Sequence, residues 1–249
     1  MNAETQDKRD DNQPTPMPED PPPSKAADDA DRPRRGPRIR TILSVILIGV
    51  LGLSGLGMWW SMQPQKFDVI ETARELLEGQ LNEDIDDDTI ASMPGTVSVA
   101  TAARVAQTLL EKPGGYLHND MTPPGILMDN MPSWEYGVLT ELRDSVRSFR
   151  NDFSRSQTQS VENRALKRAD SEFNFDAKSW FLPSAEEEYG QGVTELQDFV
   201  VALHTGSASS ARFYARADNL SAYLAVVEKR LGSYGQRLAA SVGDAELTA

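Results

Sequence analysis

The feature that most constrains this chain is one uncharged apolar run, Thr41 to Trp60, near its N-terminus. As an α-helix rising about 1.5 Å per residue, the run covers roughly 30 Å, the thickness of the hydrocarbon core of a bilayer. A surface helix of a water-soluble protein has a polar face, and this run has none. The sequence therefore predicts a transmembrane helix over residues 39–60 that contacts the lipid bilayer through Thr41 to Trp60.

The charges on either side of the run predict its orientation. After it, the first basic residue is Lys66. Five arginines lie immediately before it: Arg32, Arg34, Arg35, Arg38 and Arg40. Clustered basic residues stay on the cytoplasmic side, and Trp59 and Trp60 suit the opposite membrane interface. We expect a single-pass protein of the bacterial inner membrane with a cytoplasmic N-terminus and a periplasmic C-terminal domain.

A cleaved signal peptide is the alternative interpretation of the apolar run. Such a peptide has a shorter apolar core, about 7–15 residues, followed by a cleavage site with small side chains. This run is longer and continues as Met-Trp-Trp-Ser-Met-Gln. The sequence therefore favours an uncleaved signal-anchor.

The composition divides the chain into a tail, a span and one exterior domain. Residues 1–38 are rich in Pro and Asp and poor in apolar residues, which predicts a disordered cytoplasmic tail. We expect a linker over 61–66, a helical extracytoplasmic domain over 67–242 and a flexible C-terminus over 243–249. The formal charge of −13 argues against nucleic-acid binding, and the absence of cysteine excludes disulfides and thiolate chemistry.

Beyond the span, the apolar residues recur at helical spacing and no stretch alternates as a strand would. Helices are predicted over 67–81, 98–111, 134–153, 161–169, 185–205 and 213–238, with Ser98, Ser133 and Ser184 as N-caps. Residues 83–88 are predicted to form an acidic loop. The fold class is therefore all-α: one N-terminal transmembrane helix followed by a soluble multi-helix bundle and preceded by a disordered tail.

The last predicted helix carries a heptad stripe of apolar residues. Its members are spaced alternately by four and three residues: Phe213, Ala217, Leu220, Leu224, Val227, Leu231, Tyr234 and Leu238. Such a stripe can serve the core of the bundle or an intermolecular coiled coil. In a chain with several amphipathic helices the internal core is the favoured use. A homo-oligomer remains open.

Candidate catalytic groups are few and lack a motif. His118, Asp120, Asp129 and Glu135 lie in one stretch, and two of its carboxylates could perform glycoside hydrolysis on peptidoglycan. Acidic residues are common on any acidic surface, so these are weak candidates. The sequence contains no phosphate-binding loop, dinucleotide fingerprint or His-Glu-x-x-His. We expect no cofactor and no metal site.

Two long loops rich in aromatic residues are the better functional clue. They lie at 116–131 and 173–183, and they either fold back over the bundle or form a binding surface. We predict that the two loops meet and cap one end of the bundle. The partner-binding candidates are the aromatic residues in and beside them: Tyr116, Trp134, Phe175, Trp180 and Phe181.

Four segments are distinctive: PGGYLHNDMTPPGILMDNMPSWEYGVL (113–139), RNDFSRSQTQS (150–160), FNFDAKSWFLPSAEEEY (173–189) and FYARADNL (213–220). These segments resemble the bacterial domain of unknown function 2333 family. The resemblance implies a single-span inner-membrane protein with a mostly helical exterior, and it supplies no catalytic residues. It also implies that relatives continue with further helices beyond the point where this chain ends.

The function predicted from the sequence is an interaction or scaffold module of the cell envelope with an envelope protein as partner. The alternative is a carboxylate-dependent peptidoglycan hydrolase.

Overall fold

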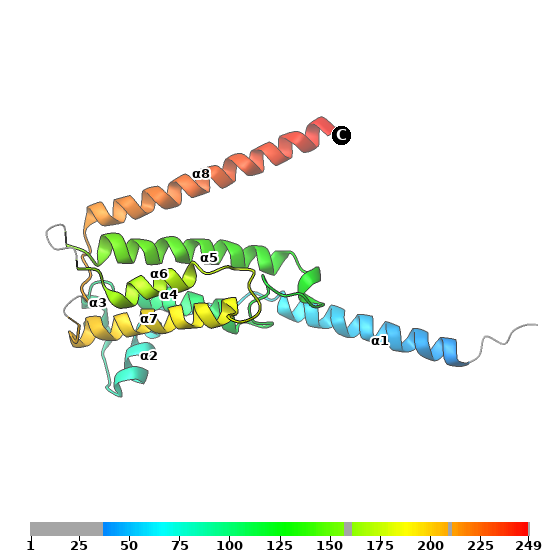
Figure 1. Ribbon diagram of the computed structural model, residues 1–249, viewed down its shortest axis with the longest axis horizontal. Helices are drawn as coiled ribbons and strands as arrows, with labels where there is room; N and C mark the ends of the chain where they lie inside the picture. The colour runs from blue at the N-terminus through cyan, green and yellow to red at the C-terminus, as the bar shows by residue number, and fades with distance from the viewer. Residues whose placement is uncertain (1–36, 157–160, 209–210, 249) are drawn as a thin grey trace, which may run out of the picture. The chain divides into compact units, whose positions relative to one another are not determined.

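The computed structural model describes residues 37–156, 161–208 and 211–248. These residues form eight α-helices, one 3-10 turn and one π-helical turn, and no strand lies among them (Figure 1). The predicted all-α class is confirmed. The predicted tail lies outside the described residues up to position 36.

The first helix, α1 (Pro37–Trp60), contains a segment long and apolar enough to cross a membrane, Ile39–Trp60. None of this segment's most apolar stretch is buried inside the protein. The predicted span is therefore confirmed as a membrane-helix candidate by length, composition and exposure. The chain divides into two compact units between residues 47 and 48, and the second unit contains the later part of α1 and all the helices that follow it.

Four helices form the centre of this second unit. They are α4 (Thr96–Glu111), α5 (Asn130–Ser148), α6 (Arg164–Phe173) and α7 (Ala185–Thr205). Each packs against two others, because α4 and α6 both contact α5 and α7 (Figure 1). The chain runs alternately up and down through them, as in an antiparallel four-helix bundle. We call the end where α4 and α6 finish the loop end, because loops 112–129 and 174–184 lie there.

Three further helices pack on the outside of this bundle. Helix α2 (Val69–Leu81) contacts α4 and α7, and the short α3 (Asp87–Ser92) contacts α2 and α4. Helix α8 (Ala217–Thr248) contacts α5. It begins at the end of the bundle opposite the loop end.

The core is formed by the inward faces of α2, α4, α5, α6 and α7, together with Ile90 of α3. Its largest fully buried apolar side chains are Tyr189, Phe173, Phe199, Leu77, Ile90, Leu109, Leu139, Leu166 and Leu196. Helices α6 and α7 approach closely at Gly192, where an added Cβ would lie 2.9 Å from the ring of Phe173. This narrow contact explains why a residue without a side chain stands in the middle of α7.

The two ends of α7 follow the sequence prediction. Ser184 is the N-cap, and its side chain accepts a hydrogen bond from the amide of Glu187. Gly206, with φ of 61°, ends the helix in the left-handed conformation. Both predictions are confirmed because the cap and the stop depend on local backbone chemistry alone.

The predicted N-caps Ser98 and Ser133 are wrong. Helix α4 begins at Thr96 after Gly95, whose φ of 88° favours glycine. A Cβ on Gly95 would lie 2.2 Å from the Phe213 ring, so the helix start is fixed by a distant aromatic residue. Helix α5 begins at Asn130 and places Ser133 inside its first turn.

Other boundaries differ by a few residues or add an element. The predicted acidic loop contains the N-cap of α3, because the Asp86 carboxylate accepts from the amide of Thr89 at 2.7 Å. Asn163 caps α6 in the same way. Helix α8 begins at Ala217 and leaves Phe213 in the preceding segment. It continues as helix to Thr248.

Candidate functional site

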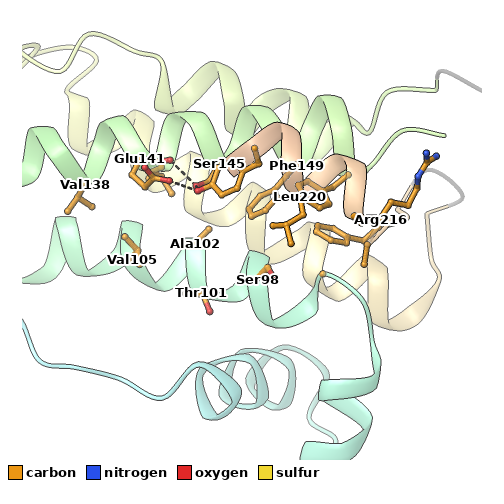
Figure 2. A pocket seen from close by; sticks show the side chains of 17 residues that line it. Ser98, Thr101, Ala102, Val105, Val138, Glu141, Ser145, Phe149, Arg216 and Leu220 are labelled. Carbon is orange, nitrogen blue, oxygen red and sulfur yellow. Dashed lines mark hydrogen bonds between the residues drawn. The ribbon is translucent and has the colours of Figure 1, made fainter. Parts of the chain in front are cut away.

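An apolar groove lies between α4, α5 and the first turns of α8. Its volume is about 740 Å³. Figure 2 shows side chains from all three helices converging on it. The apolar lining includes Ala102, Val105, Val138, Leu142, Phe149 and Leu220. The groove is therefore a concave surface of a kind that accepts apolar side chains.

Three polar side chains, Glu141, Ser145 and Tyr223, border the groove where α5 meets α8. Tyr223 of α8 donates its hydroxyl proton to Glu141, and its oxygen lies 3.0 Å from the Ser145 hydroxyl (Figure 2). Burial raises the pKa of the Tyr223 hydroxyl, and the hydrogen bond to the Glu141 carboxylate raises it further. The phenol therefore stays neutral and acts as a donor.

An aromatic cluster closes the groove at the end opposite the loops. The rings of Phe153 and Phe213 stack with centroids 4.9 Å apart, and Phe149 lies 5.9 Å from Phe213. The backbone amide of Tyr214 donates to the carbonyl of Phe153 at 2.7 Å. These contacts fix the segment that leads into α8.

The heptad stripe of α8 is largely exposed. Leu231 is 63% exposed, and Leu238 is 68% exposed. Leu220, Leu224 and Tyr234 are also exposed. The prediction that the stripe serves the bundle core is therefore wrong.

The reason is that α8 contacts α5 through the neighbouring face of the helix. Tyr223 and Arg230, which are seven residues apart on that face, bind polar groups of α5. Val227 lies between them and is half-buried. The polar contacts rotate the apolar stripe away from α5, which leaves it continuous with the groove at Leu220.

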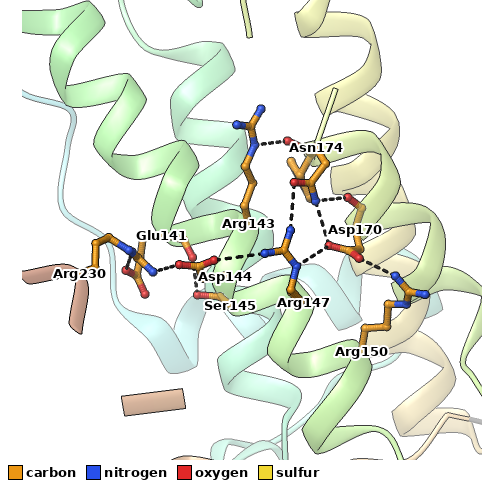
Figure 3. Close-up of polar contacts among 10 residues, drawn as sticks. Glu141, Arg143, Asp144, Ser145, Arg147, Arg150, Asp170, Asn174 and Arg230 are labelled. Carbon is orange, nitrogen blue, oxygen red and sulfur yellow. Dashed lines mark hydrogen bonds and ion pairs between the residues drawn. The ribbon is translucent and has the colours of Figure 1, made fainter. Parts of the chain in front are cut away.

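Figure 3 shows a charge network that joins α8, α5 and α6. Arg230 pairs with Glu141 and Asp144 of α5. Arg147 lies 3.7 Å from Asp144 and 3.9 Å from Asp170 of α6. The network positions α8 through several weak pairs rather than through an apolar core.

The network extends to Arg150, in the π-helical turn Phe149–Phe153 that follows α5. Arg150 binds Asp170 at 2.6 Å and also pairs with Glu162. Hydrogen bonds from Arg150 hold the pKa of the Glu162 carboxyl below its usual value. The carboxylates of Asp170 and Glu162 in turn raise the pKa of the guanidinium.

The predicted catalytic carboxylates have separate local partners. Glu135 is fully buried and pairs with Lys112, and its oxygens accept the amide of Leu117 at 2.9 and 3.0 Å. Burial raises the pKa of Glu135, and Lys112 and the Leu117 amide oppose the rise. Asp120 accepts from the amide and the hydroxyl of Thr122.

Asp129 and His118 complete the predicted catalytic set. Asp129 is exposed and precedes α5 without a side-chain capping bond. His118 Nδ1 lies 3.2 Å from the carbonyl oxygen of Pro132, and the His118 ring stacks on Tyr136. None of the four residues lines the groove.

The aromatic candidates divide into buried and exposed side chains. Tyr116 is 4% exposed and Phe175 packs against the core, so both contribute to the interior of the protein. Trp134 is 37% exposed, whereas Trp180 and Phe181 are 59% and 66% exposed. The last two are therefore available for contacts outside the protein.

The two aromatic loops meet at the loop end, as predicted. The Tyr116 hydroxyl donates to the carbonyl of Ala177 at 3.2 Å. The Asn119 amide donates to the carbonyl of Ser179 at 2.8 Å and to Glu186 at 2.9 Å. Side chains of the first loop thus satisfy backbone carbonyls of the second.

No group of three His, Asp or Glu side chains within the described residues is placed to hold a metal ion.

Residues 35–249 match a bacterial family described as "uncharacterized protein conserved in bacteria (DUF2333)". The chain belongs to this family. The resemblance stated from the four sequence segments is therefore confirmed. No curated protein and no solved structure matches the chain.

The groove and the exposed α8 stripe were not predicted from the sequence of this family member. The heptad pattern was visible, but its exposure depends on which face of α8 contacts α5. The available signal was the line of polar residues on one face of the same helix, Tyr223 and Arg230.

Proposed function

We propose that this protein is a membrane-anchored interaction module of the cell envelope that binds an amphipathic helix of a partner protein. The binding surface is the groove together with the apolar stripe of α8. The observation that carries the proposal is that these two apolar surfaces share Leu220, which lines the groove and is itself an exposed member of the stripe. Helix-in-groove recognition uses this combination of surfaces.

The proposed topology places the bundle in the periplasm. The arginine cluster before the span supports a cytoplasmic N-terminus, and the length of the span supports an uncleaved signal-anchor. The domain limits proposed from the sequence are a tail over 1–38, a linker over 61–66 and an exterior domain over 67–242. In this topology the groove faces other envelope proteins.

Charge favours a different protein, rather than a second copy of this one, as the partner. The chain has a formal charge of −13, so two copies repel each other as they approach. A different protein with a less acidic surface meets no such repulsion.

The geometry does not favour the alternative function, a carboxylate-dependent peptidoglycan hydrolase. Its best-placed carboxylate, Glu135, has no exposed surface and pairs with Lys112. A general acid or nucleophile must reach the glycosidic bond.

The experiment that tests the proposal uses a photo-reactive amino acid at Leu224 or Leu231 of the full chain in its native membrane. Gln236 is the matched control, because it lies on the opposite face of α8 and is exposed. We expect an adduct to a helical segment of another envelope protein from positions 224 and 231, and none from 236.

A synthetic peptide of the captured segment then supplies the affinity test. Leu224→Asp should weaken its binding to the purified full chain more than tenfold, and Gln236→Asp should leave it unchanged. Adducts only between copies of this chain, or equal adducts from all three positions, would contradict the proposal.

A further inference from the structure

We propose that the loop end of the bundle rests on the surface of the lipid bilayer through an apolar patch that is separate from the groove. The patch, here called the lipid-facing patch, comes from both aromatic loops. Its members are Met121, Ile126, Leu127, Trp180, Phe181 and Leu182. The proposed ligand is a lipid surface, which adds a second contact with the membrane to the span itself.

The first loop adjoins the last turn of the membrane-helix candidate. A Cβ on Gly114 would lie 2.7 Å from the indole of Trp60, and a Cβ on Gly57 would lie 3.6 Å from the side chain of Pro124. Pro124 directly precedes the 3-10 turn Gly125–Leu127, which carries two members of the patch. The first loop therefore lies where the span leaves the hydrocarbon.

The second loop is held to the first by hydrogen bonds from the side chains of Tyr116 and Asn119. Asn119 binds the carbonyl of Ser179 and the carboxylate of Glu186, at 2.8 and 2.9 Å. Ser179 directly precedes Trp180 in the chain, and Asn119 lies two residues before Met121. The two halves of the patch are thus parts of one fixed surface.

All six side chains of the lipid-facing patch are largely exposed to solvent. Leu127 is 80% exposed and Leu182 is 77% exposed, and the other four members are at least 57% exposed. Six large, exposed apolar side chains on two loops that are hydrogen-bonded to each other exceed the scattered apolar residues of an ordinary surface, and such a group marks a binding or membrane site.

Continuity with the span identifies lipid, rather than protein, as the occupant. Met58 and Trp59, in the last turn of α1, are 75% and 54% exposed, so the apolar surface of the helix extends to the loops. Tryptophan is enriched at the membrane interface, and Trp180 supplies it here on a loop. Asp120, Asp129 and Asp176 lie close by in the sequence, so attraction to anionic lipid is not the basis of the contact.

The absence of cysteine from the natural chain allows a direct test. We would attach a nitroxide to Leu127→Cys or Phe181→Cys in the full chain, reconstituted in phosphatidylcholine nanodiscs. Collision with oxygen reports lipid, and collision with a water-soluble nickel chelate reports solvent. Val161→Cys is the matched control, because Val161 is 67% exposed and precedes α6 at the opposite end of the bundle.

We expect the ratio of oxygen to nickel collisions at positions 127 and 181 to exceed that at position 161 several-fold. Adding phosphatidylglycerol should leave the ratio unchanged. Equal ratios at the three positions would overturn the proposal, as would insertion that occurs only with anionic lipid. Spin–spin broadening between copies, with shielding from both reagents, would assign the patch to self-association instead. Circular dichroism of each variant confirms that it is folded.

Discussion

Lys112 and Glu135 form an ion pair in which neither side chain has any exposed surface. Lys112 also donates to the carbonyl of Gly115, and Glu135 accepts the amide of Leu117. The pair therefore ties the end of α4 to the first turns of α5 and fixes the turn between residues 112 and 117. Both aromatic loops start from, or pack on, this turn.

Removing one partner of this pair should strongly destabilise the protein. Glu135→Ala leaves a buried lysine without its carboxylate, and such losses cost about 3–5 kcal/mol. The free energy of unfolding in urea, measured on the full chain in detergent micelles, would show the loss. The double variant Lys112→Met with Glu135→Leu leaves no buried charge and should recover most of it. Equal destabilisation by the single and double variants would contradict an electrostatic role.

Because α6 and α7 are in close contact at Gly192, a larger side chain at this position should lower the stability of the protein. In Gly192→Ala the new methyl meets the Phe173 ring at 2.9 Å, so one of the helices must shift. We expect a loss of about 1–3 kcal/mol, which is typical of overpacking. Gly190→Ala is the matched control in the same helix, because nothing lies within 4 Å of its Cβ position. It should be neutral or raise the melting temperature, since alanine favours the helix.

The carboxyl groups of Glu172 in α6 and Glu188 in α7 interact, and this interaction should make the stability of the fold depend on pH. The hydrogen bond to Glu188, together with partial burial, raises the pKa of Glu172 to about 7 from its usual 4.5. The folded state thus binds this proton more tightly than the unfolded chain does. Stability from this group is therefore present below pH 4.5 and is lost as the pH rises through about 7.

Glu172→Gln keeps a hydrogen-bond donor and removes the titration. Melting temperatures measured between pH 5 and pH 8 should therefore fall less in this variant than in the natural chain. A matched control is Glu162→Gln, because hydrogen bonds from Arg150 lower the pKa of Glu162 and its contribution is lost only in acid. The prediction fails if Glu172→Gln and the natural chain have parallel profiles.

In the charge network of Figure 3, Arg230 attaches α8 to α5, so its loss should loosen α8. Arg230→Gln removes the ion pairs to Glu141 and Asp144, and hydrogen bonds to charged groups are worth about 1.5–3 kcal/mol. We expect the backbone amides of α8 to exchange hydrogen roughly tenfold faster, which corresponds to about 1.4 kcal/mol.

The amides of α4 and α7 should keep their protection in Arg230→Gln, because they belong to the four-helix core. Arg168→Gln is the control, since Arg168 pairs with Glu195 at 2.8 Å between α6 and α7 and does not contact α8. Faster exchange throughout the bundle in Arg230→Gln would show that α8 is part of the cooperative core.

Local chemistry made parts of this fold predictable. The apolar run before Trp60, the Ser184 cap and the Gly206 stop each depend on residues that are neighbours in the chain. The start of α4 was not predictable in this way, because Gly95 is required there by the ring of Phe213, more than a hundred residues away. The same holds for Glu135, whose role depends on Lys112 in another helix.

The sequence by itself determined the membrane-helix candidate, the all-α class and the family. These follow from hydrophobic periodicity, composition and long loop strings, which are properties of contiguous residues. Only the tertiary structure decided which apolar surfaces remain exposed. Tyr116 is buried and Leu231 is exposed because burial depends on which face of a helix meets its neighbour. In α8, the hydrogen bonds of Tyr223 and Arg230 to α5 determine which face of the helix is covered and leave the apolar stripe exposed.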